Sequence, residues 1–161
     1  MRNRLIRGIV ILFTALLLFG CDEATGIIMD LPPSFAGDLP PFVISKPVVE
    51  IIERPYHFRY AGVVFNFLNQ AEEIIDGITV SFLLFDPKTL GSPFIGSNKF
   101  EITMQDIMFP DENREITISL DKFIHIAPAD PYLIDYFYIY EIHYVGGVVW
   151  QDKYGKYRVR Y

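Results

Sequence analysis

The sequence has 161 residues but only one cysteine, Cys21, and one tryptophan, Trp150. A single cysteine excludes an intramolecular disulfide framework and every metal site that needs two or more thiolates. Basic residues are also scarce: three of the 14 lie in the first seven positions, and the chain from residue 21 onward carries 11 against 20 acidic residues. Nucleic-acid binding depends on clustered Lys and Arg that neutralise phosphates. We therefore expect no nucleic-acid partner.

The chain also lacks an apolar run long enough to span a bilayer comfortably. The longest, Gly8–Phe19, has twelve residues, whereas a spanning helix needs about 20. Three arginines and no acidic residue precede it. A positive start followed by a short apolar core is the pattern of a secretory signal peptide, which we predict for residues 1–20.

The apolar core ends in Leu18-Phe19-Gly20-Cys21. These residues resemble the lipobox of bacterial lipoproteins, with an aliphatic residue three positions before the cysteine and a small residue just before it. The resemblance implies cleavage before Cys21, a diacylglycerol on its thiol and an acylated amino group. It also implies a protein held by lipid on a membrane of the bacterial cell envelope, with the membrane and leaflet left open. The alternative is a short buried helix with a buried cysteine.

The composition changes after Cys21 to Gly, Pro, Asp and Ser, as in the stretch PPSFAGDLPP. We interpret residues 21–41 as the lipidated cysteine and a flexible tether. At about 3.3–3.6 Å per residue, the extended tether spans several nanometres. The remaining residues, 42–161, are near one half apolar and form the predicted domain.

β-Branched and aromatic residues dominate this domain, and no window shows a helical stripe. We predict an all-β fold, an immunoglobulin-like two-sheet Greek-key sandwich of about seven strands. A closed barrel is the main alternative. The expected strands lie near residues 43–53, 57–68, 75–85, 98–106, 114–120, 134–145 and 148–160.

Alternation within these strands predicts which side chains face the core. In two strands apolar residues alternate with polar ones, and Gly146-Gly147 has the composition of a two-residue hairpin. In the sixth strand, alternation groups the tyrosines with two isoleucines on one face and Phe137 with His143 on the other. The apolar residues of the two alternating strands are Phe100, Ile102 and Met104 in one, and Ile116, Ile118 and Leu120 in the other. In the sixth strand, one face carries Ile134, Tyr136, Tyr138, Tyr140, Ile142 and Tyr144, and the other carries Phe137, Ile139, Glu141 and His143.

Three stretches resemble a class of small bacterial immunoglobulin-like domains with the signature F-x-L-Y-D. They are Phe82-Leu83-Leu84-Phe85-Asp86, then Phe65-Asn66-Phe67-Leu68-Asn69 followed by Ile75, and Ile142-His143-Tyr144-Val145-Gly146-Gly147. The resemblance implies an accessory or interaction module on a lipoprotein, with no catalytic residue and no cofactor.

The residues themselves give little support for catalysis. His57, His125 and His143 lie far apart, and none has a Cys, Asp or second His two or four positions further on, so we predict no metal site. No nucleophile or nucleotide-binding motif is present. We therefore predict a non-enzymatic binding or accessory module. The alternative is an envelope hydrolase or metal-dependent enzyme whose dispersed residues meet in a pocket.

Tyrosine is concentrated near the C-terminus, where eight of ten lie between Tyr132 and Tyr161. There they accompany Trp150 and a basic cluster, which suits a surface for an acidic envelope protein or cell-wall polymer. The competing interpretation is that the aromatic residues form core and that the charges protect a sheet edge. The candidate partner-binding residues are Tyr144, Trp150, Tyr154, Lys156, Tyr157 and Arg158.

Overall fold

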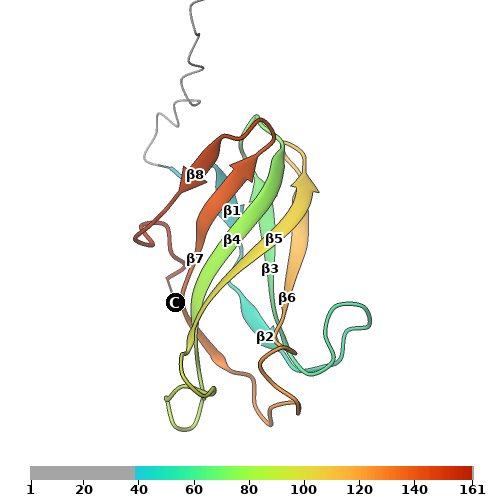
Figure 1. The fold of residues 1–161 in the computed structure, drawn as a ribbon, viewed down its shortest axis with the longest axis vertical. Coiled ribbons are helices and arrows are strands. Elements are labelled where there is room, and N and C mark those ends of the chain that lie inside the picture. The colour runs from blue at the N-terminus through green and yellow to red at the C-terminus, as the bar shows by residue number, and fades with distance from the viewer. Residues whose placement is uncertain (1–38, 161) are drawn as a thin grey trace, which may run out of the picture. The chain divides into compact units, whose positions relative to one another are not determined.

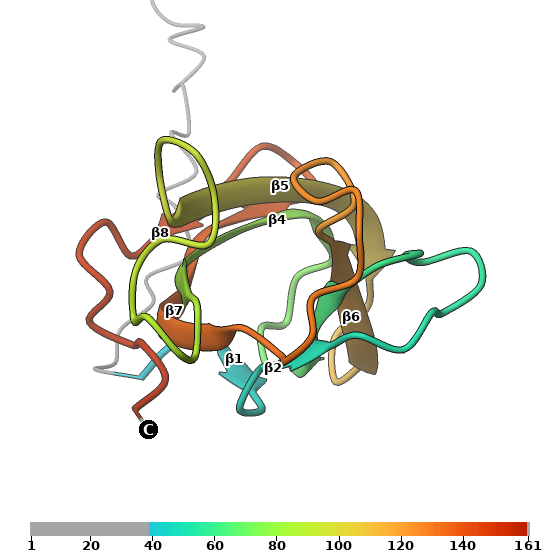
Figure 2. The same ribbon diagram turned by 90° about the horizontal axis from the view of Figure 1, so that it is seen from below.

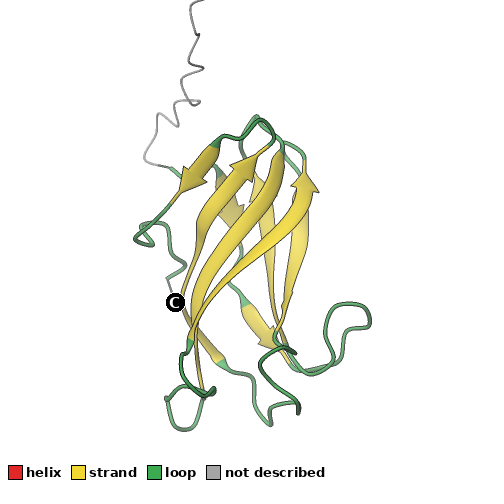
Figure 3. Cartoon of the chain, viewed as in Figure 1, coloured by secondary structure: helices red, strands yellow, loops and turns green. Residues whose placement is uncertain are grey.

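The computed structural model describes residues 39–160. The signal peptide predicted at 1–20, Cys21 and the tether up to residue 38 lie outside the described residues, as does Tyr161. The described residues form eight strands, every pairing antiparallel, and contain no helix (Figure 3). Within them, no helix is long and apolar enough to cross a membrane.

The first sheet is organised around β3 (Gly62–Asn69). One edge of β3 pairs with β6 (Asn113–Ser119), from Gly62 opposite Ser119 to Leu68 opposite Asn113. The other edge pairs with two short strands, β1 (Phe42–Ile44) and β2 (Val48–Glu50). These two strands therefore act as one interrupted edge strand.

The second sheet has the order β5-β4-β7-β8. Its central strands are β4 (Ile75–Phe85) and β7 (Leu133–Tyr144), flanked by β5 (Lys99–Met108) and β8 (Val149–Gln151). Figures 1 and 2 show β4 and β5 on one side of the domain and β1, β2 and β6 on the other. No ladder joins the two sheets within residues 39–160, so the architecture is a sandwich-like pair of sheets and not a closed barrel.

Aromatic side chains fill the space between the sheets. The ring of Phe137 on β7 lies 4.9 Å from that of Phe65 on β3 and 5.8 Å from that of Phe82 on β4. Such pairs add to the stabilisation that burial alone provides. Large side chains that are almost fully buried include Phe65, Phe67, Phe82, Leu84, Leu120, Phe137, Ile139, Ile142 and Tyr144.

Several predicted strands agree with the structure. β4 has the predicted bounds, and β5 and β6 lie within two residues of theirs. In β5, Glu101, Thr103 and Gln105 are exposed whereas the alternating apolar residues are at least partly buried, as predicted. The predicted first strand is wrong as a continuous element. It is interrupted at residues 45–47, where Pro47 has no N–H to donate to a ladder.

The predicted second strand begins too early. Residues 54–60 form a tight loop in which Arg54 and Phe58 make an isolated bridge and Tyr56 adopts a φ of 69°. His57 therefore lies in a loop and not on a strand. The carboxylate of Asp121 holds this loop, because it accepts hydrogen bonds from the backbone N–H groups of Arg59 and Tyr60 at 2.8 and 2.9 Å.

The prediction that all tyrosines of β7 share one face is wrong. The register between β4 and β7 shifts at three places, first between Ile75 and Gly77 and then between Thr79 and Val80 and between Ser81 and Leu83. The last two shifts each insert one extra residue into β7, and an extra residue turns the following side chains to the opposite face. The buried face of β7 consequently combines Phe137 and Ile139 with Ile142 and Tyr144.

The predicted last strand, 148–160, is also wrong beyond its first residues. β8 ends at Gln151, and the chain then follows an irregular path. The glycine turn before it does form, with φ of 104° at Gly146 and 86° at Gly147. The Tyr144 N–H donates to the Val148 carbonyl at 2.9 Å, so the hairpin loop has three residues, including Val145.

Asn69 has a structural role that explains its place in the sequence. Its side chain is fully buried. The amide nitrogen donates to the carbonyls of Glu73 at 3.0 Å and Phe109 at 3.2 Å, and the amide oxygen accepts from the N–H of Ala71 at 3.0 Å. Asn69 thereby joins the β3–β4 connection to the turn between β5 and β6.

Candidate functional site

Two of the six candidate binding residues belong to the core. Tyr144 is 1% exposed and Trp150 is 9% exposed. Tyr144 lies on the buried face of β7, where burial, together with the nearby charge of Glu73, raises the pKa of its phenol. The ring of Trp150 packs edge-on against Phe42, with centroids 5.3 Å apart. Tyr144 therefore offers no surface to a partner, and its prediction as a binding residue is wrong, whereas Trp150 exposes only a small part of its side chain.

The other four candidates lie in residues 152–160, which we call the C-terminal segment. Tyr154 is 85% exposed, Lys156 and Arg158 are exposed, and Tyr157 is partly buried. Two further cations of this segment, Lys153 and Arg160, are exposed as well. The structure thus brings the predicted aromatic and basic side chains together, although not on a strand.

Asp152 sets the path of the C-terminal segment. This buried carboxylate accepts backbone N–H hydrogen bonds from Tyr154 at 3.3 Å, Lys156 at 3.0 Å and Tyr157 at 2.9 Å. A carboxylate that receives several N–H groups can replace the ladder that an extended strand would provide. The segment therefore leaves β8 as a structured loop.

Tyr136 supports the segment from the side. Its hydroxyl donates to the Tyr154 carbonyl at 3.0 Å, and the guanidinium carbon of Arg158 lies 5.1 Å from its ring centroid. Gly155 lies against the same ring and has a φ of 64°. A Cβ at this position would lie 3.0 Å from a ring carbon of Tyr136. This close approach requires glycine.

The C-terminal segment borders a depression of about 450 Å³. Trp150, Tyr154 and Tyr157 contribute aromatic surface to it. Leu39, the first described residue, lines the same depression and is 82% exposed. The other lining residues are Gln151, Asp152, Lys153 and Lys156.

The charge of this surface differs from that of the rest of the chain. Residues 152–160 contain four cations and one acid, and that acid, Asp152, is buried and hydrogen-bonded to backbone. Residues 21–151 contain seven basic and 19 acidic residues. An anionic partner is therefore attracted to the C-terminal segment and repelled elsewhere.

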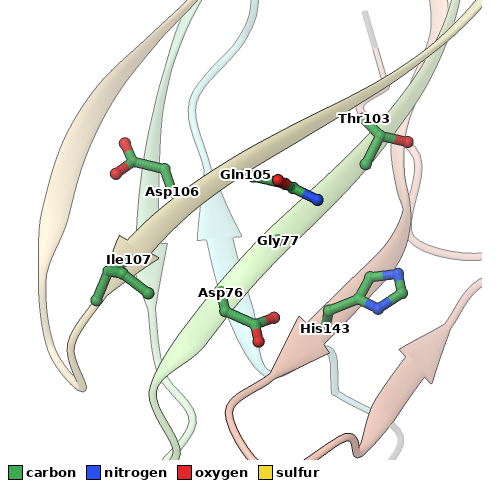
Figure 4. A pocket seen from close by; sticks show the side chains of 7 residues that line it. All are labelled: Asp76, Gly77, Thr103, Gln105, Asp106, Ile107 and His143. Carbon is green, nitrogen blue, oxygen red and sulfur yellow. The ribbon is translucent and has the colours of Figure 1, made fainter.

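A second depression, of about 660 Å³, lies on the outer face of the β5-β4-β7 sheet. Gly77 forms part of its floor, and Figure 4 shows Asp76 and His143 on neighbouring strands beside it. Asp106 lies across β5 from His143 in this view and pairs with Arg114 of β6. The remaining lining residues are Thr103, Gln105 and Ile107.

His143 is held by a carboxylate next to this depression. Its Nε2 contacts Glu141, and the other oxygen of Glu141 accepts a hydrogen bond from the Gln151 amide at 2.8 Å. The sequence contained a signal for this pair, because Glu141 and His143 are two positions apart on a strand and therefore share a face. Gln151 joins them only through the pairing of β8 with β7.

A third, smaller cleft of about 280 Å³ opens between β5 and β6. Its floor is apolar, formed by Ile78, Met104, Met108 and Ile116, and Arg114 contributes to its lining. Within residues 39–160, no group of three or more His, Cys, Asp or Glu side chains is placed to hold a metal ion.

No known family model matches the chain, and no curated protein is similar to it in sequence. The fold is similar to that of a crystal structure of a hypothetical protein from Peptoclostridium difficile 630. The similarity covers 73% of this chain and 89% of the other, with a TM-score of 0.51 and 12% identity. At this identity, the likeness concerns the fold alone.

Proposed function

We propose that this protein is a bacterial lipoprotein, anchored to an envelope membrane through acylated Cys21, whose domain is a non-enzymatic binding module. The anchor is supported by the order of three arginines, a twelve-residue apolar core and Gly20-Cys21. Two or more acyl chains on one cysteine would hold the protein firmly on a bilayer.

The domain is proposed to be immunoglobulin-like and related to the F-x-L-Y-D class. Its strand order supports this, because β1 and β2 together, β3 and β6 follow the order A-B-E, and β5-β4-β7-β8 follows C′-C-F-G of such sandwiches. The residues that carry the resemblance also have structural roles. Phe65, Phe67, Phe82 and Leu84 are buried in the core, and the side chain of Asn69 links two turns by hydrogen bonds.

The observation that carries the binding function is the C-terminal segment. It presents exposed tyrosine and four cations on an otherwise acidic chain, beside a depression with aromatic walls. Aromatic and basic side chains together favour an anionic partner. We assign Tyr154, Lys156, Tyr157 and Arg158 to this surface, with Lys153 and Arg160.

Charge removal tests the binding function. Lys153→Gln with Lys156→Gln lowers the charge of the C-terminal segment, while Lys99→Gln with Lys122→Gln makes the same net change at exposed positions elsewhere. On a carboxylate or phosphate matrix, the detergent-solubilised wild-type protein should be retained at low salt. Retention should fall in the first variant and remain in the second. Equal retention of both variants would contradict the assignment.

The anchor is tested separately by Cys21→Ser. Wild-type protein should enter the detergent phase on phase partitioning as a processed form, whereas Cys21→Ser should remain unprocessed or become aqueous. Processing and partitioning that do not change would exclude Cys21 as the lipid acceptor.

An enzymatic role is the second candidate, favoured by the Glu141–His143 pair beside the depression over Gly77. A carboxylate that orients a histidine is a common arrangement for general acid–base catalysis. Incubation with envelope material would then release soluble sugar or peptide products, detected by mass spectrometry. Release that His143→Gln abolishes and His57→Gln preserves would favour the enzyme over the binding module.

A further inference from the structure

The described chain begins at the surface that carries the basic cluster. Leu39 lines the same depression as Lys153, Tyr154 and Lys156. The position of this start is fixed by packing, because Phe42 contacts Trp150 of β8, the strand that leads into the C-terminal segment, and the Pro41 carbonyl accepts a hydrogen bond from Gln70 N–H at 3.0 Å. The connection toward Cys21 therefore leaves the domain next to the C-terminal segment.

The length of that connection limits how far the surface can be from a membrane. Leu39 is 18 positions after Cys21, so the two residues can be at most about 65 Å apart when the chain is fully extended. Whatever bilayer holds Cys21 is consequently at high effective concentration for the side of the domain on which Leu39 lies.

The exposed side chains on that side suit a membrane surface. Leu39 and Tyr154 are 82% and 85% exposed, and tyrosine is favoured at the boundary between headgroups and hydrocarbon. Lys153 and Lys156 line the same depression, and Arg158 and Arg160 of the C-terminal segment are exposed as well. Clustered cations next to an anchor are attracted to anionic lipid headgroups.

The remaining charges would fix the orientation. Residues 21–151 carry 19 acidic and seven basic residues, so other faces of the domain are repelled by an anionic surface. We infer that the C-terminal segment docks on the anionic headgroups of the membrane in which Cys21 is anchored. This inference rests on the proposed lipid anchor, and it names the anionic partner as the bilayer itself.

Trp150 makes docking measurable, because it is the one tryptophan of the chain and lines the depression. The full-length lipidated protein is reconstituted into vesicles of phosphatidylcholine, with or without phosphatidylglycerol, that contain a headgroup-nitroxide lipid. Quenching of Trp150 emission reports proximity to the headgroups. We expect strong quenching in the anionic vesicles, weak quenching in the neutral ones, and loss of the difference at high salt.

Two matched variants test the electrostatic basis. At roughly fivefold per cation, Lys153→Gln with Lys156→Gln should weaken docking about 25-fold and reduce quenching. Lys99→Gln with Lys122→Gln, which has the same net charge, should be quenched like the wild type. Equal quenching of both variants would overturn the inference.

Vesicle flotation separates failure of docking from failure of the anchor. Protein that floats with anionic vesicles but shows no more quenching there than in neutral vesicles keeps its anchor and refutes docking. Protein that does not float refutes the anchor and the inference with it. If soluble polyglutamate binds the solubilised protein but Trp150 remains unquenched in vesicles, the surface serves a soluble acidic partner and the membrane inference is overturned.

Discussion

Phe42 packs edge-on against Trp150, so the first strand of the domain touches β8, the strand that leads into the C-terminal segment. The ring of Trp150 also lies 6.0 Å from that of Tyr157 within the segment. Phe42 is itself buried and stacks on Phe67 of β3. This cluster joins both ends of the described chain to the core.

Phe42→Ala should remove this connection. We expect a loss of about 3 kcal/mol in the free energy of unfolding, because a buried ring is replaced by a cavity. The emission of Trp150 should also shift to longer wavelength as water reaches the indole. Chemical denaturation followed by tryptophan fluorescence measures both effects. Phe109→Ala, at an exposed position, is the control, and equal losses in the two variants would contradict the packing described.

Asp152→Ala should loosen the C-terminal segment without unfolding the sandwich. The substitution leaves the backbone N–H groups of Lys156 and Tyr157 without their carboxylate acceptor, at a cost of about 2 kcal/mol. Hydrogen exchange at these two amides should accelerate, while exchange in β4 and β7 should change little. Asp152→Asn keeps one acceptor oxygen and should give an intermediate result. Unchanged exchange in the alanine variant would show that the segment is held by other contacts.

Asp121 should make stability depend on pH. Burial opposes ionisation of its carboxyl, but hydrogen bonds from the backbone N–H groups of Arg59 and Tyr60 outweigh burial and lower its pKa. A lowered pKa gives stability that is present above the unfolded-state pKa of about 4 and is lost as pH falls through the folded-state value. Asp121→Asn should therefore be less stable than wild type by about 1 kcal/mol at pH 7.

Denaturant unfolding across the pH range tests this effect. The difference between wild type and Asp121→Asn should shrink as the pH falls below about 4, because the wild-type carboxyl then becomes protonated. Asp111→Asn, at an exposed turn position, is the control and should change the free energy of unfolding little. If the difference in unfolding free energy between wild type and Asp121→Asn stays constant down to pH 2, the electrostatic explanation is disproved.

Asn69→Ala should cost about 3 kcal/mol, because it removes the hydrogen bonds that the Asn69 side chain makes to the Glu73 carbonyl and the Ala71 N–H. Asn66→Ala, on the same strand but exposed, should cost much less. Thermal unfolding of both variants provides the comparison. Similar melting temperatures for the two would show that the side chain of Asn69 does not hold the two turns together.

The alternation of apolar and polar residues predicted the strands well where the pairing between neighbouring strands is regular. β4 is long and bounded by turn residues, and β5 alternates cleanly, so both were predicted within two residues. The faces of β7 were predicted wrongly because its bulges arise from the pairing with β4, which no single strand encodes. Tyr136 lies at one of these bulges and has a φ of 51°, a backbone conformation that tyrosine rarely adopts.

The candidate site was predicted in part for the same reason. The composition of residues 152–160 indicated an aromatic and basic surface, and Tyr154, Lys156 and Arg158 are exposed. The sequence did not indicate that the chain would leave β8 at Asp152, because the N–H groups that donate to its carboxylate reach it only when the loop closes back on itself. Tyr144 and Trp150 carry the same residue chemistry as the exposed aromatics, and only their place on the inner faces removes them from the surface.

The membrane anchor is the claim on which the proposed function depends most. Mass spectrometry of the N-terminal peptide from protein extracted with detergent tests it most directly. We expect the mature chain to begin at Cys21, with the added mass of a diacylglycerol on its thiol and, where the amino group is modified, of an acyl chain. An unmodified Cys21 peptide, or an intact peptide that continues from residues 1–20 through Cys21, would contradict the proposal.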